Sequence, residues 1–374
     1  MISNRITEIL FRLNIKEKIE VEVLQEAFKD ILEEANSQTR DVLLGALLTG
    51  IMLKGPTVNE IVALLRATLS LDSYSPENSV KITLPKNKLL VGAVGSGKKG
   101  IKTMNISTCS LLVASSVGAY TAKPGSSSTS SITGSADFMR EVGANLDLSQ
   151  EEMINVLLDT GIGFFSIENT IPNFDKVYGG RFYVPHALSF ALAAILSPIK
   201  FDNLLYGLAH PDIELATKVI REFGINNAMV VTSTHDELHY IDEMGAYGDT
   251  KIIEMCKGGI RKLKHINSKE FFNLPQYSPI DIAQGVSKEE NIKYAMDVLR
   301  GCGERAREDI VCINAGTLLY LSNIAEDLRE GYNLAKNSIR KGKPLDKLLE
   351  FIERTNGEKK LFDKYYSNIS KKVI

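Results

Sequence analysis

A glycine-rich loop with two lysines is the first stretch of the sequence that could bind a charged ligand. Residues 95–100 read G-S-G-K-K-G; they follow an apolar run expected to be a strand and precede Asn105, which is expected to cap a helix carrying Ser107 and Thr108. Glycines let the backbone approach a ligand, and the free N–H groups of a helix start favour anions. A P-loop would need Ser or Thr where Lys99 stands, so the loop indicates a different phosphate ligand. The alternative is a tight turn with two solvated lysines.

A second loop, residues 122–139, is rich in hydroxyl groups and reads A-K-P-G-S-S-S-T-S-S-I-T-G-S-A-D-F-M. A serine run alone is typical of a flexible linker. This run follows the next expected strand, however, and leads into a helix near Ser135. Two successive strand-to-helix loops lie side by side at the edge of a parallel sheet where ligands bind. Together the two loops favour a sugar phosphate or a diphosphate as ligand.

The composition is that of a globular enzyme. The chain has 374 residues, 44% hydrophobic and 24% charged, with a formal net charge of -2, which argues against a nucleic-acid partner. The longest apolar runs are shorter than the ~20 residues that span a bilayer, and the start does not look like a signal peptide, so we expect a cytoplasmic protein without membrane contact. Four separated cysteines indicate reduced thiols, and the five histidines show no zinc-binding spacing.

The order of expected elements predicts an α/β fold, with a small N-terminal helical domain and a large α/β domain whose central sheet is mainly parallel and flanked by helices. The helical domain is expected at residues 1–72, with a helical contribution from about 172–198. T-V-N-E at 57–60 predicts a capping box there. Strands alternating with helices indicate that the α/β domain spans 80–356, and 357–374 is expected to be a solvated C-terminal tail.

Several motifs together resemble those of the anthranilate phosphoribosyltransferase family, within the wider glycosyltransferase family 3 and nucleoside phosphorylase type II group. These are G-S-G-K-K-G with T-M-N-I-S-T at 103–108, K-P-G-S-S-S-T-S-S-I-T-G-S-A-D at 123–137, L-K-G-P-T-V-N-E-I at 53–61, and R-E-D-I-V-C-I-N-A-G at 307–316. The resemblance covers nearly the whole chain. It implies an enzyme that uses Mg²⁺, transfers 5-phosphoribose from phosphoribosyl diphosphate to a nitrogen of a small aromatic acid, and forms a homodimer through the helical domain.

The resemblance also implies roles for individual residues. The acceptor is expected to contact Gly95, Ser126 and Arg181, with a surface arginine in a turn as the alternative for Arg181. Mg²⁺ is expected on Ser107, Asp242 and Glu243, with solvated acids as the alternative; Asp236 and Glu237 are excluded by their distance from the G-x-T at 248–250. Phosphoribosyl diphosphate is expected to contact Gly95, Ser96, Gly97, Lys98, Lys99, Thr103, Asn105, Ile106, Ser107, Thr108, Lys123, Gly125, Ser126, Ser127, Ser128, Ser130, Ser131 and Ser135.

The chain departs from the family pattern in both loops. Lys98 and Lys99 stand where the family has Gly-Asp, and K-P-G-S-S at 123–127 stands where it has K-H-G-N-R. The histidine and asparagine belong to the acceptor side of the family's site, so we expect an acceptor other than anthranilate. Two alternatives are a non-catalytic paralogue that binds a phosphorylated ligand and a nucleoside phosphorylase.

Overall fold

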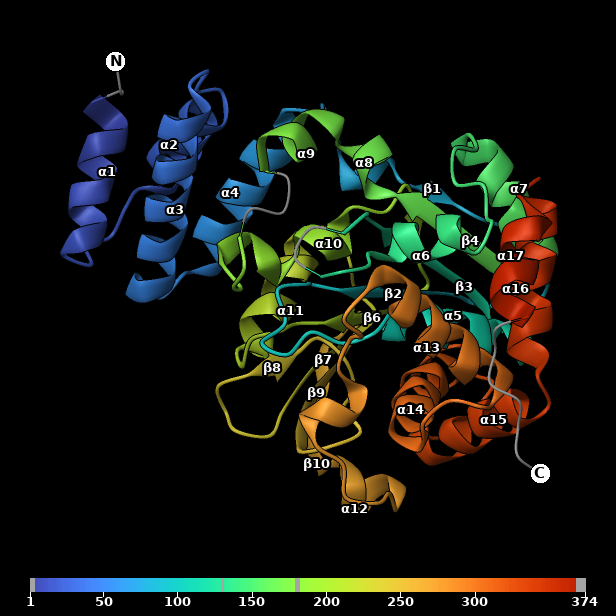
Figure 1. Ribbon diagram of the computed structural model, residues 1–374. Coiled ribbons are helices and arrows are strands. Elements are labelled where there is room, and N and C mark those ends of the chain that lie inside the picture. The colour runs from blue at the N-terminus through green and yellow to red at the C-terminus, as the bar shows by residue number, and fades with distance from the viewer. Residues whose placement is uncertain (1–3, 129–130, 179–181, 368–374) are drawn as a thin grey trace.

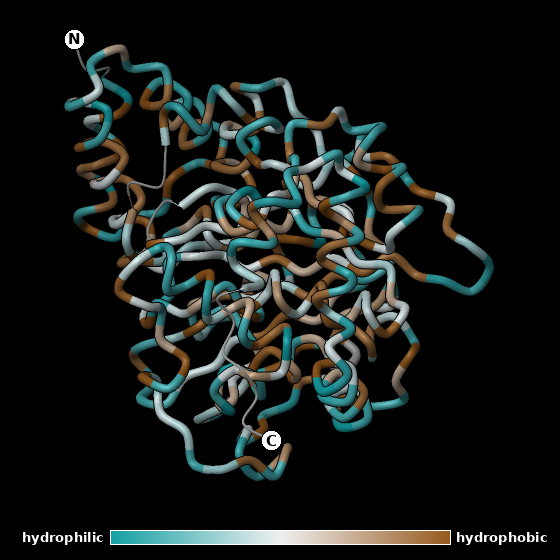
Figure 2. Tube along the Cα trace, turned by 45° about the vertical axis from the view of Figure 1, so that its right-hand side comes forward, coloured by the Kyte–Doolittle hydropathy of each residue, from teal (hydrophilic) through white to brown (hydrophobic). Residues whose placement is uncertain are grey.

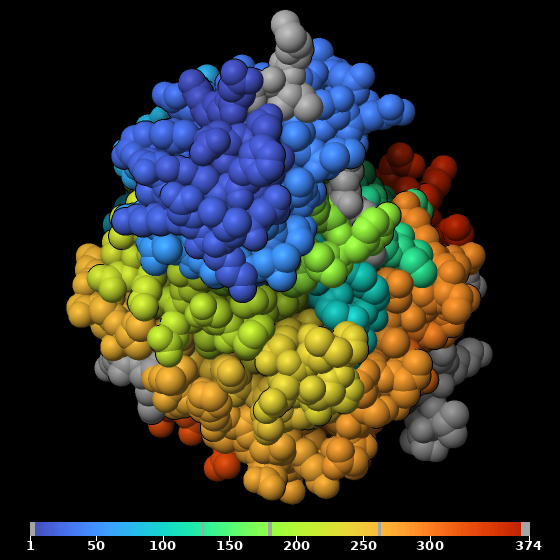
Figure 3. All heavy atoms as spheres, turned by 90° about the vertical axis from the view of Figure 1, so that its left-hand side faces the viewer, coloured from blue at the N-terminus to red at the C-terminus, as the bar shows by residue number. Residues whose placement is uncertain are grey.

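The computed structural model describes residues 4–128, 131–178 and 182–367, and its chain begins with four packed helices (Figure 1). These are α1 (Asn4–Asn14), α2 (Val21–Leu32), α3 (Ser37–Lys54) and α4 (Val58–Ser70). The predicted capping box is confirmed: Thr57 Oγ1 accepts from the N–H of Glu60, and Glu60 Oε2 accepts from the N–H of Thr57. Figure 3 shows the N-terminal helices, in blue, covering one side of the molecule.

The rest of the chain is built on one large sheet, in the order β10-β9-β7-β6-β2-β3-β4, with β8 beside β7. The five central strands run parallel, whereas β8, β9 and β10 are antiparallel, so the predicted α/β fold with a mainly parallel sheet is confirmed. The strands are β2 (Leu90–Gly95), β3 (Tyr120–Gly125), β4 (Ile162–Ser166), β6 (Asn203–Gly207), β7 (Ala228–Thr234), β8 (Tyr240–Ile241), β9 (Asp249–Cys256) and β10 (Gly259–Asn267), and a separate small sheet pairs β1 (Val80–Lys81) with β5 (Ile199–Lys200).

Helices cover both faces of this sheet (Figure 1). They are α5 (Ile106–Ser116), α6 (Ser135–Glu141), α7 (Gln150–Thr160), α8 (Ile167–Thr170), α9 (Pro172–Tyr178), α10 (Leu192–Ile195), α11 (Ile213–Glu222), α12 (Ser268–Phe272), α13 (Lys288–Arg300), α14 (Arg305–Leu321), α15 (Leu328–Arg340), α16 (Lys343–Arg354) and α17 (Lys359–Ser367), with the short 3₁₀ helices η1 (Pro76–Asn78), η2 (Ala187–Phe190) and η3 (Pro279–Ile282). Within the described residues, no helix is long and apolar enough to cross a bilayer.

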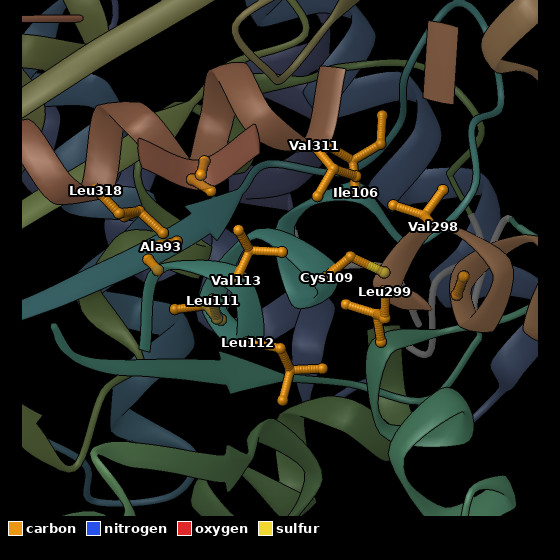
Figure 4. Packing of buried hydrophobic residues seen from close by; sticks show 14 of the residues in the cluster. Ala93, Ile106, Cys109, Leu111, Leu112, Val113, Val298, Leu299, Val311 and Leu318 are labelled. Atoms are coloured by element: carbon orange, nitrogen blue, oxygen red, sulfur yellow. The ribbon is translucent and has the colours of Figure 1, made fainter. Parts of the chain in front are cut away.

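The two faces of the sheet contribute to two different hydrophobic cores, because successive side chains of a strand point to opposite sides. On β6, Leu205 belongs to the core that contains α5, α13 and α14, and Figure 4 shows this packing around Cys109 and Val113. Leu204 and Tyr206 belong to the other core, which also contains α1–α4 and apolar side chains of α9, η2 and α10. Figure 2 shows hydrophobic segments inside the molecule and hydrophilic ones concentrated at its periphery.

The C-terminal segment corrects one expectation. Residues 357–374 were expected to form a solvated tail, but 359–367 form α17, which packs against α13 and α16. Phe362 and Tyr365 are only 4% and 7% exposed. Residues three apart lie on the same face of a helix, so these two aromatic rings pack together into the core. The charged residues around them hid this pattern in the sequence.

Candidate active site

Both loops singled out in the sequence lie at the carboxyl ends of neighbouring strands, β2 and β3, and border one pocket of about 160 Å³. The acidic pair 242–243, which follows β8, reaches the same pocket. Figure 3 shows the teal region of the glycine loop reaching the surface between the yellow and orange segments. The pocket is lined by Gly95, Gly97, Lys98, Lys99, Lys102, Thr103, Met104, Asn105, Ile106, Ser107, Thr108, Lys123, Ser126, Ser127, Ser131, Thr133, Gly134, Ser135, Asp242 and Glu243.

The glycine loop is held against the acidic pair by backbone contacts. Gly97 and Lys98 have φ angles of 67° and 58°, so the chain turns through the left-handed region that glycine tolerates best. The N–H of Gly97 donates to Oδ2 of Asp242 at 2.8 Å. A Cβ on Gly95 would lie 2.3 Å from the same oxygen, so only glycine fits at position 95 while Asp242 keeps this position.

The serine loop is held by two acidic side chains. Oδ2 of Asp137 accepts from the N–H groups of Ser128 and Gly134, both at 2.8 Å, and Oε1 of Glu168 accepts from the N–H of Ser127 at 2.5 Å. A Cβ on Gly134 would lie 2.4 Å from the backbone of Ser127 and of Ser128. The described residues on either side of 129–130 are therefore folded against one another and against two acids, unlike a linker.

Two buried oxygen atoms at the start of α5 lack a hydrogen-bond partner. Asn105 occupies the N-cap position as predicted, but its side chain does not cap the helix; its Nδ2 donates to the carbonyl of Thr133 at 3.2 Å. Asn105 Oδ1 and Thr108 Oγ1 are left unpaired. Buried polar atoms are nearly always satisfied in folded proteins, so these two, which lie on residues lining the pocket, favour a polar ligand there.

Lys99 forms the central ion pair of the site. Its Nζ lies 3.1 Å from Asp242 Oδ1 and 3.1 Å from Glu243 Oε1, and it donates to Thr103 Oγ1 at 2.9 Å. Burial alone would lower the pKa of Lys99, but the two carboxylates raise it above its ordinary value, so the ammonium keeps its charge. Burial raises the pKa of Glu243, and Lys99 acts in the opposite direction.

Three more lysines make the pocket positive. Lys123 donates to Ser107 Oγ at 2.9 Å, and Lys98 lies 5.9 Å from the ring centre of Tyr178. Burial lowers the pKa of both Lys98 and Lys123 to about 8, and for Lys98 the neighbouring Lys102 adds to this effect. Four lysines and two carboxylates line the pocket, so its formal charge is positive by two. Such a surface is suited to a ligand with several phosphate groups.

The residues predicted to hold Mg²⁺ lie together, but the structure places a lysine ammonium on each of them. Lys99 contacts Asp242 and Glu243, and Lys123 contacts Ser107. The oxygen ligands are of the kind that Mg²⁺ prefers. The position between the two carboxylates is nevertheless filled by a cation of the chain itself, so this arrangement does not fit a metal ion there. Within the described ranges, no group of three or more His, Cys, Asp and Glu side chains forms a metal-binding cluster.

Most of the predicted site residues are brought to the pocket, with a few exceptions. Ser96 lies outside its lining, because its Oγ accepts from the N–H of Ala209 and so fixes the loop to the end of β6. Gly125 and Ser128 also do not line the pocket. Ser130 and Arg181 lie outside the described residues, so their predicted roles stay predictions.

Sequence reasoning missed four residues of the lining, Lys102, Met104, Thr133 and Gly134. The K-K-x-x-K spacing at 98–102 was the signal for Lys102. Asp236 and Glu237 do not line the pocket; Asp236 instead accepts from the backbone of its own turn, at Leu238 and His239.

The structure also contains a larger cavity of about 570 Å³, between η1, α10 and the amino ends of β2 and β6. None of the glycine, serine or acidic residues of the two loops lines it. Ligands of open parallel sheets bind at the carboxyl ends of the strands, so we assign the site to the smaller pocket.

Comparison with known proteins identifies the family of the chain. A family profile described as glycosyl transferase family, a/b domain, matches residues 87–345. The anthranilate phosphoribosyltransferase of Paracidovorax citrulli is 32% identical over 84% of this chain and 87% of its own length, and that of Aquifex aeolicus is 30% identical over 89% and 94%.

Solved structures show the same fold. The anthranilate phosphoribosyltransferase of Saccharomyces cerevisiae, in complex with PRPP and Mg, superposes with a TM-score of 0.75 at 19% identity, over 95% of this chain and 99% of that one. The enzyme of Thermus thermophilus gives a TM-score of 0.72 at 22% identity, over 93% and 99%. With its motifs, its fold and its sequence relatives in agreement, the chain belongs to the anthranilate phosphoribosyltransferase family of glycosyltransferases.

Proposed function

We propose that the protein transfers 5-phosphoribose from phosphoribosyl diphosphate to a nitrogen of a small aromatic acid. The observation that carries this proposal is the convergence of the glycine loop, the serine loop and four lysines on one pocket at the start of α5. Phosphoribosyl diphosphate carries phosphate groups at both ends of the ribose, and the lysines of the glycine loop and the hydroxyls of the serine loop line the pocket that would hold them. The unpaired oxygens of Asn105 and Thr108 are available to the ribose hydroxyls between them.

The chemistry asks little of an acid or base. The C1–O bond breaks with its electrons leaving on the diphosphate, the lone pair of the acceptor nitrogen forms the C1–N bond, and a proton leaves the nitrogen for solvent. Positive charge near the leaving group and orientation of the acceptor therefore supply most of the rate enhancement. The ammonium groups of Lys98, Lys102 and Lys123 face the pocket with this charge.

Mg²⁺ enters this proposal as part of the substrate. Mg²⁺ is commonly bound through substrate phosphates together with one or two carboxylates. Because Lys99 occupies the carboxylate pair here, we propose that the ion arrives on the diphosphate rather than being held in advance by Asp242 and Glu243.

We further propose that the acceptor differs from anthranilate. In this chain Pro124 offers no side-chain donor, and Ser126 and Ser127 are shorter than the asparagine and arginine of the family motif. Beside this position Lys98 lies over Tyr178, which stacks on Phe174 and Phe182. An aromatic wall next to a lysine suits a planar acid of different shape, with Arg181 proposed as a second partner of its carboxylate.

The test is binding of phosphoribosyl diphosphate, followed by its consumption with a panel of aromatic amines and acids. In calorimetry the double variant Ser107→Ala/Lys123→Ala should lose binding. Ser79→Ala/Lys81→Ala, the same changes at the larger cavity, is the matched control and should bind as the wild type does. Unchanged affinity in the first variant would overturn the site. Binding without turnover of any acceptor would indicate a non-catalytic binding protein instead.

We also propose that the protein forms a homodimer through its N-terminal helices. Phe11 and Ile15, at the end of α1, and Val42 and Leu53, on α3, are 65–74% exposed. Because α1 and α3 pack against each other, these apolar side chains lie on one helical unit. Light scattering should give a dimer for the wild type and a monomer for Phe11→Asp/Leu53→Asp. Val286→Asp, which changes an even more exposed valine elsewhere, should remain a dimer; a monomeric wild type would refute the proposal.

A further inference from the structure

The strongest unexplained feature of the site is the position of the Lys99 ammonium between two buried carboxylates. The side chains of Asp242 and Glu243 are 2% and 7% exposed, and that of Lys99 is 17% exposed. An ammonium group has three N–H donors. In this structure three oxygens surround it within 3.1 Å, one each from Asp242, Glu243 and Thr103. Lys99 thus hydrogen-bonds Thr103 and Glu243 and forms an ion pair with Asp242, whose Oδ1 has no hydrogen-bond partner among the described residues. The ammonium is held by the protein and does not extend into the pocket as a solvated side chain.

A divalent cation on this pair would need the same oxygens. Mg²⁺ binds oxygen ligands at about 2.0–2.1 Å, a distance that leaves no room for an ammonium contacting the same two atoms. Lys99 would have to move away from the two carboxylates, and its ammonium group would then lie close to the doubly charged metal ion. Expelling the lysine would also cost the contact with Thr103 Oγ1. The buried pair thus holds one cation at a time, and the chain supplies that cation itself.

The remaining charges of the pocket are compatible with a metal-free pair. With Lys99 neutralising one of the two carboxylates, Lys98, Lys102 and Lys123 leave the formal charge of the lining positive. A diphosphate therefore meets a cationic surface without help from a protein-bound metal ion.

We propose that Lys99 is the resident cation of the Asp242–Glu243 pair, and that this protein binds the diphosphate group of its substrate without a divalent metal ion on these carboxylates. The inference rests on the proposed function for the identity of the ligand. Lys99 acts here as a positioning residue, because it contacts the two acids rather than the substrate. It takes over the charge-neutralising role that a metal ion would have on the pair.

The first test measures Mn²⁺ binding by electron paramagnetic resonance with the whole protein and no other ligand. The wild type should bind Mn²⁺ no better than about 1 mM. Lys99→Met, which keeps the length of the side chain and removes its charge, should bind at least tenfold more tightly. Adding Asp242→Asn/Glu243→Gln to that variant should remove the gain. The matched control Lys102→Met removes a charge from the same pocket and should bind as weakly as the wild type.

The second test measures binding of inorganic diphosphate to the wild type in the presence of EDTA. It does not use Lys99→Met, so it remains available if that variant does not fold. Binding in EDTA is expected. The proposal is overturned if diphosphate does not bind without a metal ion, or if the wild type binds one Mn²⁺ that Asp242→Asn/Glu243→Gln removes. Either result leaves the proposed function intact as long as phosphoribosyl diphosphate still binds with Mg²⁺. Failure to bind phosphoribosyl diphosphate under all conditions refutes the proposed function instead.

Discussion

The N–H of Gly97 donates a 2.8 Å hydrogen bond to the carboxylate of Asp242, which lies 145 residues farther along the chain. This bond fixes the glycine loop to the acidic pair, so the position of the loop depends on that of Asp242. The close packing of Gly95 and Gly207 around the same residue has the same consequence: a Cβ on Gly207 would lie 1.7 Å from the carbonyl oxygen of Asp242.

Gly207→Ala should destabilise the fold, because the added Cβ meets backbone that cannot rotate away. We expect a loss of at least about 3 kcal/mol in the free energy of unfolding, at the upper end of the range for overpacking. Urea unfolding followed by circular dichroism measures this. Gly45→Ala, on α3 with no atom within 4 Å of its added Cβ, is the control and should be neutral or stabilising. Equal stability of the two variants would show that Asp242 is not packed against β6.

Gly95→Ala should act on the ligand more than on the fold. The new Cβ would lie 2.3 Å from Asp242 Oδ2, so the side chain must rotate and give up its bond from Gly97. Loss of one such charged hydrogen bond typically costs about 1.5–3 kcal/mol, or roughly tenfold to a hundredfold in affinity for phosphoribosyl diphosphate. Calorimetry tests this, and wild-type affinity in the variant would contradict the assignment.

Ligand affinity should fall as the pH rises past about 8, because burial and Lys102 lower the pKa of Lys98 to about 8 and anions bind its protonated form. Tyr178 and the buried, neutral His186 face the same group, and Lys98 lowers the pKa of His186 further. The ratio of the diphosphate affinity of the wild type to that of Lys98→Met should therefore fall towards one as the pH is raised from 7 to 9.5. This ratio cancels the ionisation of the ligand itself, and a ratio independent of pH would refute the prediction.

The contribution of Lys98 to the free energy of unfolding changes with pH in the direction opposite to that of ligand affinity. The unfolded chain binds this proton more tightly than the folded one between about pH 8 and the ordinary lysine pKa, so stability attributable to Lys98 rises with pH in this window. Thermal melts of the wild type and Lys98→Met across the same range separate this effect from ligand binding.

The two acidic pairs should behave differently. Asp242→Asn/Glu243→Gln leaves Lys99 without its charged partners, and we expect turnover to fall at least tenfold. Asp236→Asn/Glu237→Gln makes the same chemical changes in a turn outside the pocket and should retain turnover within about twofold. Breaking a buried ion pair also costs stability, on the order of 3–5 kcal/mol, so melting curves must accompany the assay. Loss of activity in the second variant alone would place the functional acids at 236–237.

Restoring the family residues in the serine loop should restore anthranilate as an acceptor. Wild-type protein with Mg²⁺ should form little phosphoribosyl anthranilate. Pro124→His/Ser126→Asn/Ser127→Arg should form at least tenfold more, because the imidazole, amide and guanidinium groups reach farther than the side chains that they replace. Ser128→Asn, in the same loop but outside the pocket lining, is the control. Wild-type turnover of about 1–10 per second with anthranilate would refute the proposed change of acceptor.

The sequence was sufficient for the parts of the fold with short-range signals. Alternating apolar strands and helices predicted the parallel sheet, and T-V-N-E predicted the capping box of α4. The contacts of Lys99 could not be predicted, because they join residues 143 and 144 positions apart and depend on where β8 ends. The Asn105 side chain was misjudged for a similar reason: its partner, Thr133, belongs to the other loop.

The two faces of the sheet pack in separate hydrophobic cores, and this separation bears on how acceptor specificity can evolve. Met104, Ile106, Ala136 and Phe138, which support the phosphate loops, pack on one face. Phe174, Leu188 and Phe190, on the side of the proposed acceptor position, pack on the other face with the N-terminal helices. Substitutions at these positions on the second face are absorbed by a core that Met104, Ile106, Ala136 and Phe138 do not join. One wall beside the acceptor position can therefore change without repacking the residues beneath the phosphate loops.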